Sequence, residues 1–422
     1  MWRWAVGLAA LLLIAVAAYG VFALLWGVPS VPDHPLSRDP ATVAAGKYLA
    51  AAGDCASCHT AEGGEAFAGG RPLATPFGTV YSANITPDPR TGIGDLNSAR
   101  FYQLMAYGAD SVLGPLYPAM PYTSFHAITR ADSDALFAYF MSVPAVERPA
   151  TPNGMMFPFN IRPLMFGWNL LFASRARFEP DPDKDADWNR GAYLVEGLGH
   201  CGECHTPRNW LGAVEQDRAL GGAVVGQFKA PALTAAALAD RGWSRADLVL
   251  FFETGTSPQG SAFGDMFLAI KNSLRLLTND DRVAIAAYLM DVDGDEPGDG
   301  GVAVAAPGEV AHEIQSGRLL YLSNCSLCHG PNGQGIDSTM PPLAGNTTLA
   351  QADGINLIQV MAQGLDPRRM SLTQGYGPMP AFRDRLTAAQ MADLANYVRS
   401  AFAANGSDLP DLADDDVKRI LR

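Results

Sequence analysis

Every cysteine of this chain lies in one of three copies of the pentapeptide Cys-x-x-Cys-His. Two thiols at this spacing can bond covalently to the two vinyl groups of one haem, and the adjacent histidine is then the proximal ligand of its iron. Three copies that use all six cysteines predict three covalently bound haem c groups. The predicted attachment and iron-binding residues are Cys55, Cys58 and His59, then Cys201, Cys204 and His205, and finally Cys325, Cys328 and His329.

Other sites that use paired cysteines fit the spacing poorly. In a zinc ribbon the second pair follows within about 20 residues, whereas these pairs start 146 residues (201 minus 55) and 124 residues (325 minus 201) apart. A thioredoxin-like site needs neither the histidine nor three copies. A disulfide framework belongs to short secreted chains, and 422 residues can bury a core without one.

Length and charge limit the possibilities further. At roughly 100–200 residues per domain the length allows two to four domains, and three motifs favour three. The formal net charge of -13 argues against binding to nucleic acid, which needs a basic face.

The N-terminus carries an uncharged apolar stretch of 23 residues, from Trp4 to Trp26. This length suits a membrane-spanning helix of about 20 residues, and Arg3 with flanking tryptophans fits the orientation rules for such helices. The alternative is a signal peptide cleaved near Ala15–Ala17. The stretch predicts a retained anchor in the cytoplasmic membrane, with the haem domains on the periplasmic side.

A repeated frame surrounds the three motifs. A helical stretch with a glycine and a tyrosine precedes each motif, and Thr129, Thr278 and Thr387 each begin a later helix with a pattern typical of a capping box. Ten residues after each threonine comes a tyrosine within an apolar face of helical period. The repeat predicts an all-α fold of three tandem class I-like cytochrome c domains behind one N-terminal transmembrane helix.

The segments between the repeats differ in composition. The stretch 155–173 is strongly apolar and interrupted by prolines; it is either a strap packed between the first two domains or an interfacial segment that contacts lipid or a quinone. The stretch 291–310 is rich in Gly, Pro and Asp, which favours a flexible linker. The predicted divisions are 1–30 (membrane anchor or signal sequence), 40–148 (first cytochrome c domain), 149–181 (apolar connecting segment), 182–292 (second domain), 293–310 (flexible linker), 311–402 (third domain) and 403–422 (acidic, solvated C-terminal tail).

Methionines decide between a carrier and a catalyst, because a methionine on the distal face closes the haem and raises its potential. Met266 is the only methionine between His205 and the capped helix that follows, and Met120 lies in a proline-flanked loop at the same distance, 61 residues, from its histidine. Met379 lies in Gly-Pro-Met-Pro just before the last capped helix. These three are the predicted distal ligands.

Several other side chains are rival candidates for ligands. Met340 follows His329 closely, so its loop is expected on the proximal side, where a backbone carbonyl can orient the histidine. His126 and His312 are the rival distal ligands, although a surface or core position is expected for both and for His34. His200 is too near Cys201 to reach the far face of its own haem. No catalytic residue is predicted.

The chain resembles the triheme cytochrome c subunits of bacterial membrane-bound dehydrogenases. The resemblance spans roughly 40–400. The stretches that carry it are 53–55 (Gly-Asp-Cys), 75–88 (TPFGTVYSANITPD), 116–122 (LYPAMPY), 199–208 (GHCGECHTPR) and 341–346 (PPLAGN).

The resemblance implies a role in an enzyme complex. The catalytic partner would be a PQQ-dependent, flavin-dependent or molybdopterin subunit that oxidises an alcohol, aldehyde or sugar in the periplasm, and the haems would pass its electrons to ubiquinone in the cytoplasmic membrane. Met120, Met266 and Met379 occupy the distal-ligand positions of the family. One departure is the N-terminus, which is long enough to be retained where many members look as if their leader is cleaved.

The predicted function is therefore electron transfer within a respiratory dehydrogenase complex, with substrate chemistry in another chain. The alternatives are a multihaem carrier that delivers electrons to a terminal oxidase, a haem peroxidase or reductase with one open haem, and a redox-inert scaffold.

Overall fold

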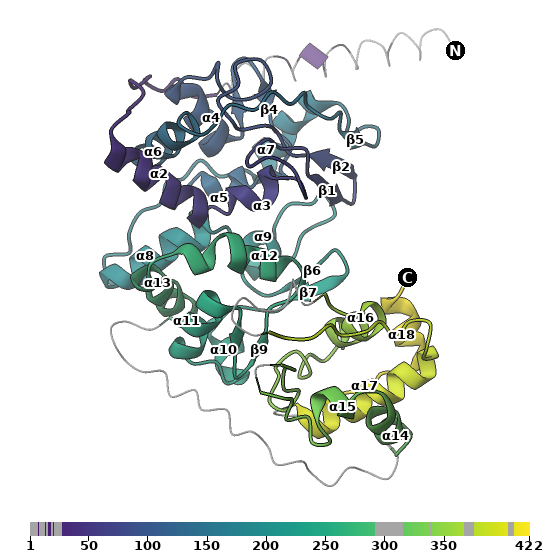
Figure 1. Ribbon diagram of the computed structural model, residues 1–422. Coiled ribbons are helices and arrows are strands. Elements are labelled where there is room, and N and C mark those ends of the chain that lie inside the picture. Colours follow the sequence, from purple (N-terminus) through teal and green to yellow (C-terminus); the bar gives the residue numbers. More distant parts are fainter. Residues whose placement is uncertain are drawn as a thin grey trace. The chain divides into compact units, whose positions relative to one another are not determined.

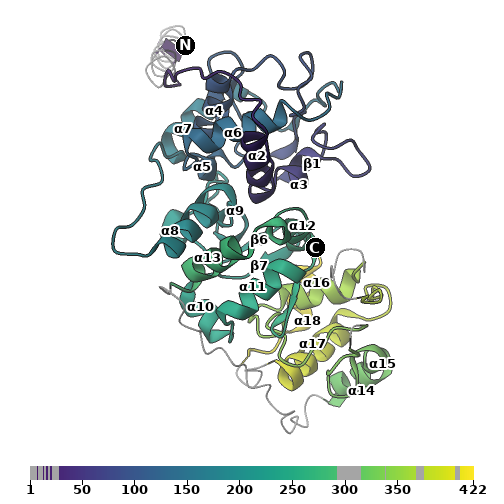
Figure 2. The same cartoon turned by 60° about the vertical axis from the view of Figure 1, so that its left-hand side comes forward.

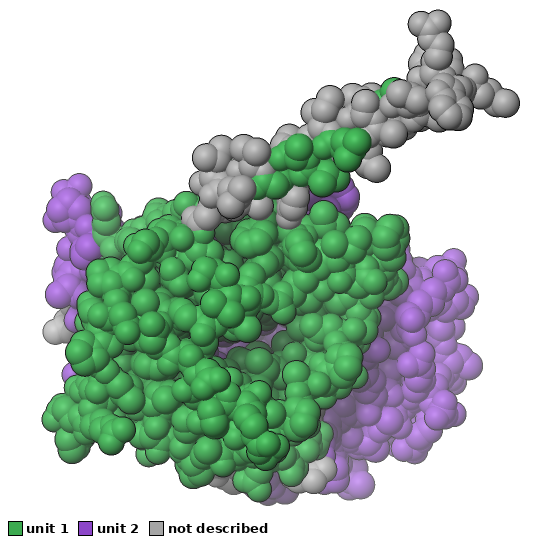
Figure 3. Space-filling model, turned by 90° about the horizontal axis from the view of Figure 1, so that it is seen from above, with its two compact units in different colours: residues 1–50, 58–179 green, residues 51–57, 180–422 purple. Residues whose placement is uncertain are grey.

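The structure is a computed structural model that describes residues 7, 13, 16, 17, 20, 28–291, 315–337, 339–366, 375–403 and 409–422. Its described residues form two compact units, shown in Figure 3: unit 1 is 1–50 with 58–179, and unit 2 is 51–57 with 180–422. The described residues 28–179, 180–291 and 315–422 are called the first, second and third repeats below, since each contains one Cys-x-x-Cys-His motif. Predicted linker residues 293–310 and His312 lie outside the described residues.

The first repeat is built from short helices and two small antiparallel sheets (Figure 1). Its helices are α2 (Pro40–Ala52), α3 (Cys55–His59), α4 (Ser98–Tyr107), α5 (Tyr122–Phe125), α6 (Arg130–Phe140), the 3-10 turn η1 (Arg162–Leu164) and α7 (Met165–Phe172). Its strands are β1 (Pro72–Thr75), β2 (Gly78–Tyr81), β3 (Ala109–Asp110), β4 (Gly114–Pro115) and β5 (Gly154–Met155).

In the second and third repeats, as in the first, a helix leads into the motif and a longer capped helix follows later. Helices of the second repeat are α8 (Ala186–Ala192), the π-helix η2 (Tyr193–Leu198), α9 (Gly202–His205), η3 (Gln216–Arg218), α10 (Ala235–Asp240), α11 (Arg245–Thr254), α12 (Gly264–Asn272), η4 (Leu274–Leu276) and α13 (Asn279–Met290). Its strands are β6 (Ala223–Val225), β7 (Phe228–Ala230), β8 (Thr256–Ser257) and β9 (Gly260–Ser261). The third repeat has α14 (Gln315–Asn324), α15 (Ser326–His329), α16 (Ile355–Gln363), α17 (Ala388–Phe402) and α18 (Asp414–Ile420).

In each repeat the first helix crosses the late capped helix at a glycine. A Cβ atom on Gly46 would lie 1.9 Å from the Ala135 carbonyl oxygen, one on Gly191 would lie 2.0 Å from that of Ala284, and one on Gly317 would lie 2.1 Å from that of Asp393. No side chain fits at such distances, so glycine is required for the close approach of the two backbones. Figures 1 and 2 both show α14 lying along α17 at one of these crossings.

The predicted helix caps are confirmed in all three repeats. The hydroxyl oxygens of Thr129, Thr278 and Thr387 accept a hydrogen bond from the backbone N–H three residues later, at 3.1, 3.2 and 3.2 Å. At Thr387 the Gln390 side chain also accepts from the N–H of Thr387, which completes a capping box. The caps fix where α6, α13 and α17 begin.

The all-α prediction was wrong, because short antiparallel sheets lie between the helices. β1, β2 and β5 form a three-stranded sheet, and the pairs β3–β4, β6–β7 and β8–β9 form two-stranded sheets. At the β1–β2 turn, the Thr75 hydroxyl donates to the Gly78 carbonyl and accepts from the Phe77 N–H. Gly78 has a φ of 124°, which only glycine adopts readily. Each hairpin spans two to four residues per strand, too few for alternation to stand out in the sequence.

The predicted transmembrane helix over 4–26 was also wrong, and with it the location in the cytoplasmic membrane. Among the residues that the structure describes, no helix is both long and apolar enough to cross a bilayer. Most of 4–26 lies outside the described residues, which include only Gly7, Leu13, Val16, Ala17 and Gly20 of this stretch.

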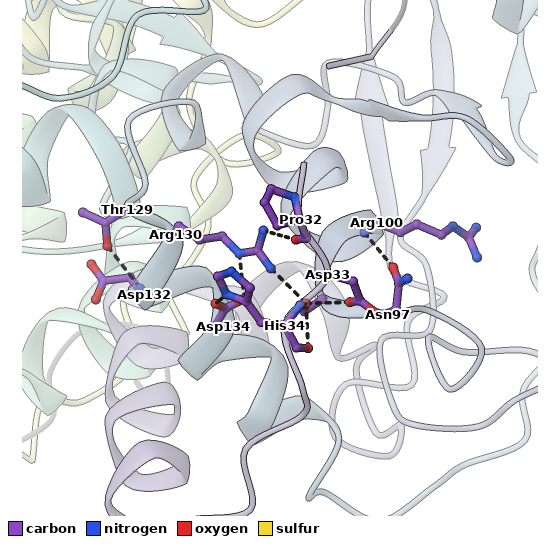
Figure 4. A network of polar contacts seen from close by, with 10 residues as sticks. Pro32, Asp33, His34, Asn97, Arg100, Thr129, Arg130, Asp132 and Asp134 are labelled. Atoms are coloured by element: carbon purple, nitrogen blue, oxygen red, sulfur yellow. Dashed lines mark hydrogen bonds and ion pairs between the residues drawn. The ribbon is translucent and has the colours of Figure 1, made fainter. Parts of the chain in front are cut away.

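The segment that follows, Pro29–His34, is tied to the first repeat by polar contacts (Figure 4). The Arg130 guanidinium donates to the Pro32 carbonyl at 2.7 Å and pairs with Asp134 at 2.8 Å. The His34 ring lies 2.6 Å from the same Asp134 carboxylate. His34 is therefore a half-exposed partner of an acid on α6, as expected of a surface histidine.

The apolar segment 155–173 packs on unit 1 through one side of α7. Asn169 is buried and bonds to the Tyr122 hydroxyl at 2.6 Å, while the Trp168 ring meets the Tyr122 ring edge-on. Other side chains of the segment are open to solvent, with Phe157 79% and Leu171, on α7, 66% exposed.

The C-terminus differs from the solvated tail that was expected. Residues 414–420 form α18, and Val417 is fully buried among the core side chains of the third repeat, which include Tyr321, Ile358, Met391 and Leu394.

Candidate haem sites

A cavity of about 160 Å³ in the third repeat brings together its complete set of predicted haem-binding residues. Cys325, Cys328, His329 and Met379 all line it. The remaining wall is mainly apolar, as a porphyrin ring requires; it includes Leu343, Leu357, Met361, Phe382, Leu394 and Val398. The donor set and the wall therefore fit a covalently attached haem.

Local structure around the third motif holds its histidine in place. Helix α14 leads directly into Cys325, and the motif itself forms α15. The buried Tyr321 hydroxyl donates to the Gly330 carbonyl at 2.6 Å, directly after His329. The chain thus leaves the motif in a fixed direction.

The three predicted proximal histidines share one hydrogen bond. Nδ1 of His59, His205 and His329 lies 2.7, 2.7 and 3.0 Å from the backbone carbonyls of Ala83, Pro231 and Pro341. A carbonyl can only accept, so Nδ1 carries the proton and Nε2 presents its lone pair. Desolvation also lowers the pKa of each imidazole, which favours the neutral, metal-binding form. Every motif therefore offers an oriented neutral imidazole nitrogen to an iron.

Two of the thiols, those of Cys201 and Cys325, lack the character of a redox or catalytic cysteine. Burial raises the pKa of Cys201 to about 12 and that of Cys325 to about 11. Reactive cysteines have pKa values lowered well below the usual 8.5, so the thioredoxin-like alternative is disfavoured. Nor does any group of three or more His, Cys, Asp or Glu side chains in the described ranges form a site for a bare metal ion.

Two methionines, not one, line the cavity of the third repeat. Met379 is held by two backbone hydrogen bonds with Leu365, at 2.9 and 3.1 Å. Met340 also lines the cavity, and its Cε would be 2.6 Å from a Cβ atom on Gly377. Its loop does supply the expected carbonyl, that of Pro341, to His329. The predicted distal ligand, Met379, thus has a competitor beside it.

The other predicted distal ligands lie at matching points of the chain. In the first repeat α4 ends at Gly108, with φ of 63°, the hairpin β3–β4 follows, and Met120 lies between it and α5. In the second repeat α11 ends at Gly255, with φ of 79°, the hairpin β8–β9 follows, and Met266 lies in the first turn of α12. Both side chains are half-buried. Their ligation remains a prediction.

The rival histidine of the first repeat has a local partner. Nδ1 of His126 lies 2.8 Å from the Thr123 carbonyl, one turn earlier in the chain.

Sequence reasoning missed one part of the third site. Ser261, Ala262 and Phe263 of the second repeat also line its cavity. No motif marks these residues, because their contact depends on how two repeats of unit 2 pack together.

Comparison with known proteins agrees with this geometry. The sequence model described as cytochrome c matches residues 43–144 and 314–402, which contain the first and third motifs. One subunit of the nicotinate dehydrogenase of Pseudomonas putida is 43% identical over 398 residues, covering 92% of this chain; the chain spans only 33% of that longer protein.

Two further relatives match over most of their own length. The cytochrome subunit of fructose dehydrogenase from Gluconobacter japonicus is 36% identical, covering 93% of this chain and 85% of the relative. The cytochrome c subunit of alcohol dehydrogenase (quinone) from Gluconacetobacter polyoxogenes is 35% identical, covering 90% and 84%. The chain therefore belongs to the family of cytochrome c subunits of bacterial dehydrogenases, electron-transfer proteins that carry covalently bound haem c.

Proposed function

We propose that this chain is a triheme electron-transfer subunit that receives electrons from a catalytic dehydrogenase subunit and delivers them to ubiquinone. The observation that carries the proposal is the cavity lined by Cys325, Cys328, His329 and Met379. The same motif with the same histidine–carbonyl bond occurs twice more, around His59 and His205. This recurrence supports a count of three.

Each repeat contributes the same chemistry through its own residues. The two cysteines of a motif would attach the haem by thioether bonds, the histidine would supply Nε2 to the iron, and Met120, Met266 or Met379 would supply a thioether sulfur as the second protein ligand. A bound haem supplies a one-electron couple between ferric and ferrous iron. The carbonyls of Ala83, Pro231 and Pro341 hold the imidazoles in the required tautomer.

Substrate oxidation is assigned to a separate subunit. The fructose and alcohol dehydrogenase relatives are named as cytochrome subunits, which supports a partner that carries the catalytic site. That partner would be of the PQQ, flavin or molybdopterin type and oxidise an alcohol, aldehyde or sugar.

Ubiquinone is proposed as the acceptor for two reasons. One relative is named as a quinone-dependent alcohol dehydrogenase subunit. The exposed apolar side chains of Met156, Phe157 and Leu171 offer an apolar acceptor a contact surface.

The test is isolation of the native complex followed by an assay of quinone reduction. The chain should co-purify with a large cofactor-containing dehydrogenase, and substrate should reduce a ubiquinone analogue. The double variant Phe157→Ser, Leu171→Ser should reduce quinone more slowly while its haems are still reduced by substrate at the normal rate. Co-purification with an oxidase and no quinone reduction would favour the terminal-oxidase carrier instead. Stoichiometric binding of carbon monoxide to one ferrous haem of the unmodified protein would favour a peroxidase or reductase.

A further inference from the structure

Unit 2 joins its two repeats through buried polar contacts. The side chain of Asn356 on α16 is only 3% exposed. It accepts from the backbone N–H of Lys229 on β7 at 2.8 Å and donates to the Lys229 carbonyl, also at 2.8 Å. The Lys229 ammonium additionally pairs with Asp353. Figures 1 and 2 show β7 and α16 side by side at this junction.

A second contact fixes the β8–β9 turn of the second repeat against the third. The carbonyl of Gln259 accepts from both the N–H and the hydroxyl of Thr347, at 2.9 and 3.2 Å. Gln259 is 2% exposed, and its side-chain amide donates to the Gly242 carbonyl at 3.0 Å and to the Asp247 carboxylate at 2.9 Å. This turn is therefore held from both sides.

The chain that leaves the turn lines the haem cavity of the third repeat. Ser261, Ala262 and Phe263 all contribute to the wall. The Phe263 ring packs edge-on against the ring of Phe228, at a centroid distance of 5.4 Å. Phe228 directly precedes Lys229, whose backbone is held by Asn356. The two polar contacts thus set the position of Phe263.

We propose that the second repeat completes the haem pocket of the third, and that the Phe263 side chain closes this pocket to water. This inference rests on the proposed function, because it requires a haem held by Cys325 and Cys328. An apolar side chain that excludes water disfavours the more highly charged ferric state, so Phe263 raises the reduction potential of that haem. The second repeat thus sets the reduction potential of the third repeat's haem through residues that no sequence motif marks.

The test is a redox titration of the full-length haem-loaded protein with Phe263→Ala. At a fixed potential, the ferric-to-ferrous ratio of one component should rise about tenfold, which corresponds to about 59 mV for a one-electron couple. That component is assigned to the third repeat by its absence in the double variant Cys325→Ser, Cys328→Ser. The matched control is Phe251→Ala, which removes the same atoms from a half-buried ring of the second repeat that does not line the cavity; the component of the third repeat should be unchanged.

Haem content is measured first, so that a failure of the proposed function can be distinguished from a failure of the role of Phe263. A protein with fewer than three haems overturns the proposed function. Three haems with a Phe263→Ala titration equal to that of the unmodified protein overturn only the closing role of Phe263. If Phe263→Ala loses haem, Phe263→Leu and Asn356→Ala replace it. Asn356→Ala should shift the same component in the same direction, and the apolar Phe263→Leu should shift it less than threefold; shifts in other components would contradict the inference.

Discussion

The loops that orient the proximal histidines differ between the second and third repeats, although they end in the same bond. The carbonyl bonded to His205 comes from a residue 26 positions later, and the one bonded to His329 comes from a residue only 12 positions later. The longer loop contains the hairpin β6–β7, and the first repeat resembles it, with β1–β2 in a loop of 24 residues. The three repeats thus keep the carbonyl contact while loop length varies. In the second repeat the additional length builds β7, which holds α16 of the third.

The largest effect is expected from a change at a feature that all repeats share. Gly317→Ala places a Cβ atom 2.1 Å from the Asp393 carbonyl oxygen, so α14 must move away from α17. We expect unfolding of the third repeat to become easier by about 3 kcal/mol, with loss of its haem, measured by denaturant titration and haem absorbance. Gly167→Ala is the control, since nothing lies within 4 Å of that position in α7, and its effect should stay within about 1 kcal/mol. Equal stability of the two variants would show that the crossing is not tight.

The second and third repeats differ in the number of candidate distal ligands. Met340 and Met379 both line the cavity of the third repeat, whereas Met266 is the one candidate predicted for the second. Met379→Leu should open one iron, so that about one haem in three binds carbon monoxide in the ferrous protein. Met340→Leu keeps Met379 and should bind none. Both are measured by absorbance during a carbon monoxide titration. The opposite result would identify Met340 as the ligand and reverse the assignment.

The sequence predicted this molecule well at the helix starts, where a short polar side chain must accept from the backbone, as Thr129, Thr278 and Thr387 do. The glycine before each motif was part of the repeat pattern, but its place at a helix crossing was not predicted. The sequence predicted less where the outcome depends on packing. The hairpins were missed because strands of two to four residues carry little pattern. Phe263 and the competition between Met340 and Met379 follow from tertiary contacts that no spacing records.

A smaller effect is expected from breaking the clamp, the pair of hydrogen bonds between Asn356 and the Lys229 backbone of β7. This change tests what the longer loop contributes. Asn356→Ala leaves the partly buried N–H and carbonyl of Lys229 without their partner, at a cost of about 1–3 kcal/mol. We expect the second and third repeats to unfold at separate denaturant concentrations in the variant and closer together in the unmodified chain. Asn332→Ala, at an exposed site of the third repeat, is the control. A single unchanged transition in Asn356→Ala would mean that the clamp does not couple the repeats.

The smallest expected effect concerns α18, which belongs to the third repeat. The Lys418 ammonium, through its hydrogen bond and its charge, holds the pKa of Asp414 below the usual 3.8. The stabilisation is therefore present above about pH 4 and is lost as the pH falls through the lowered pKa. The protection factor for hydrogen exchange around Val417, which is corrected for the intrinsic pH dependence of amide exchange, should fall at acid pH in the unmodified chain. Asp414→Asn should reduce this change. Identical pH profiles for the two proteins would exclude a role for the pair.

The central claim is that all three repeats hold a haem. It has the least support for the second repeat, because the cytochrome c sequence model matches 43–144 and 314–402 but not the residues between them. The most direct measurement is the intact mass of the purified chain, with the haem content determined on the same sample. We predict a mass increase of three haems, and a loss of one third of the haem in the double variant Cys201→Ala, Cys204→Ala. Two haems in the unmodified chain, or no loss in that variant, would contradict the account.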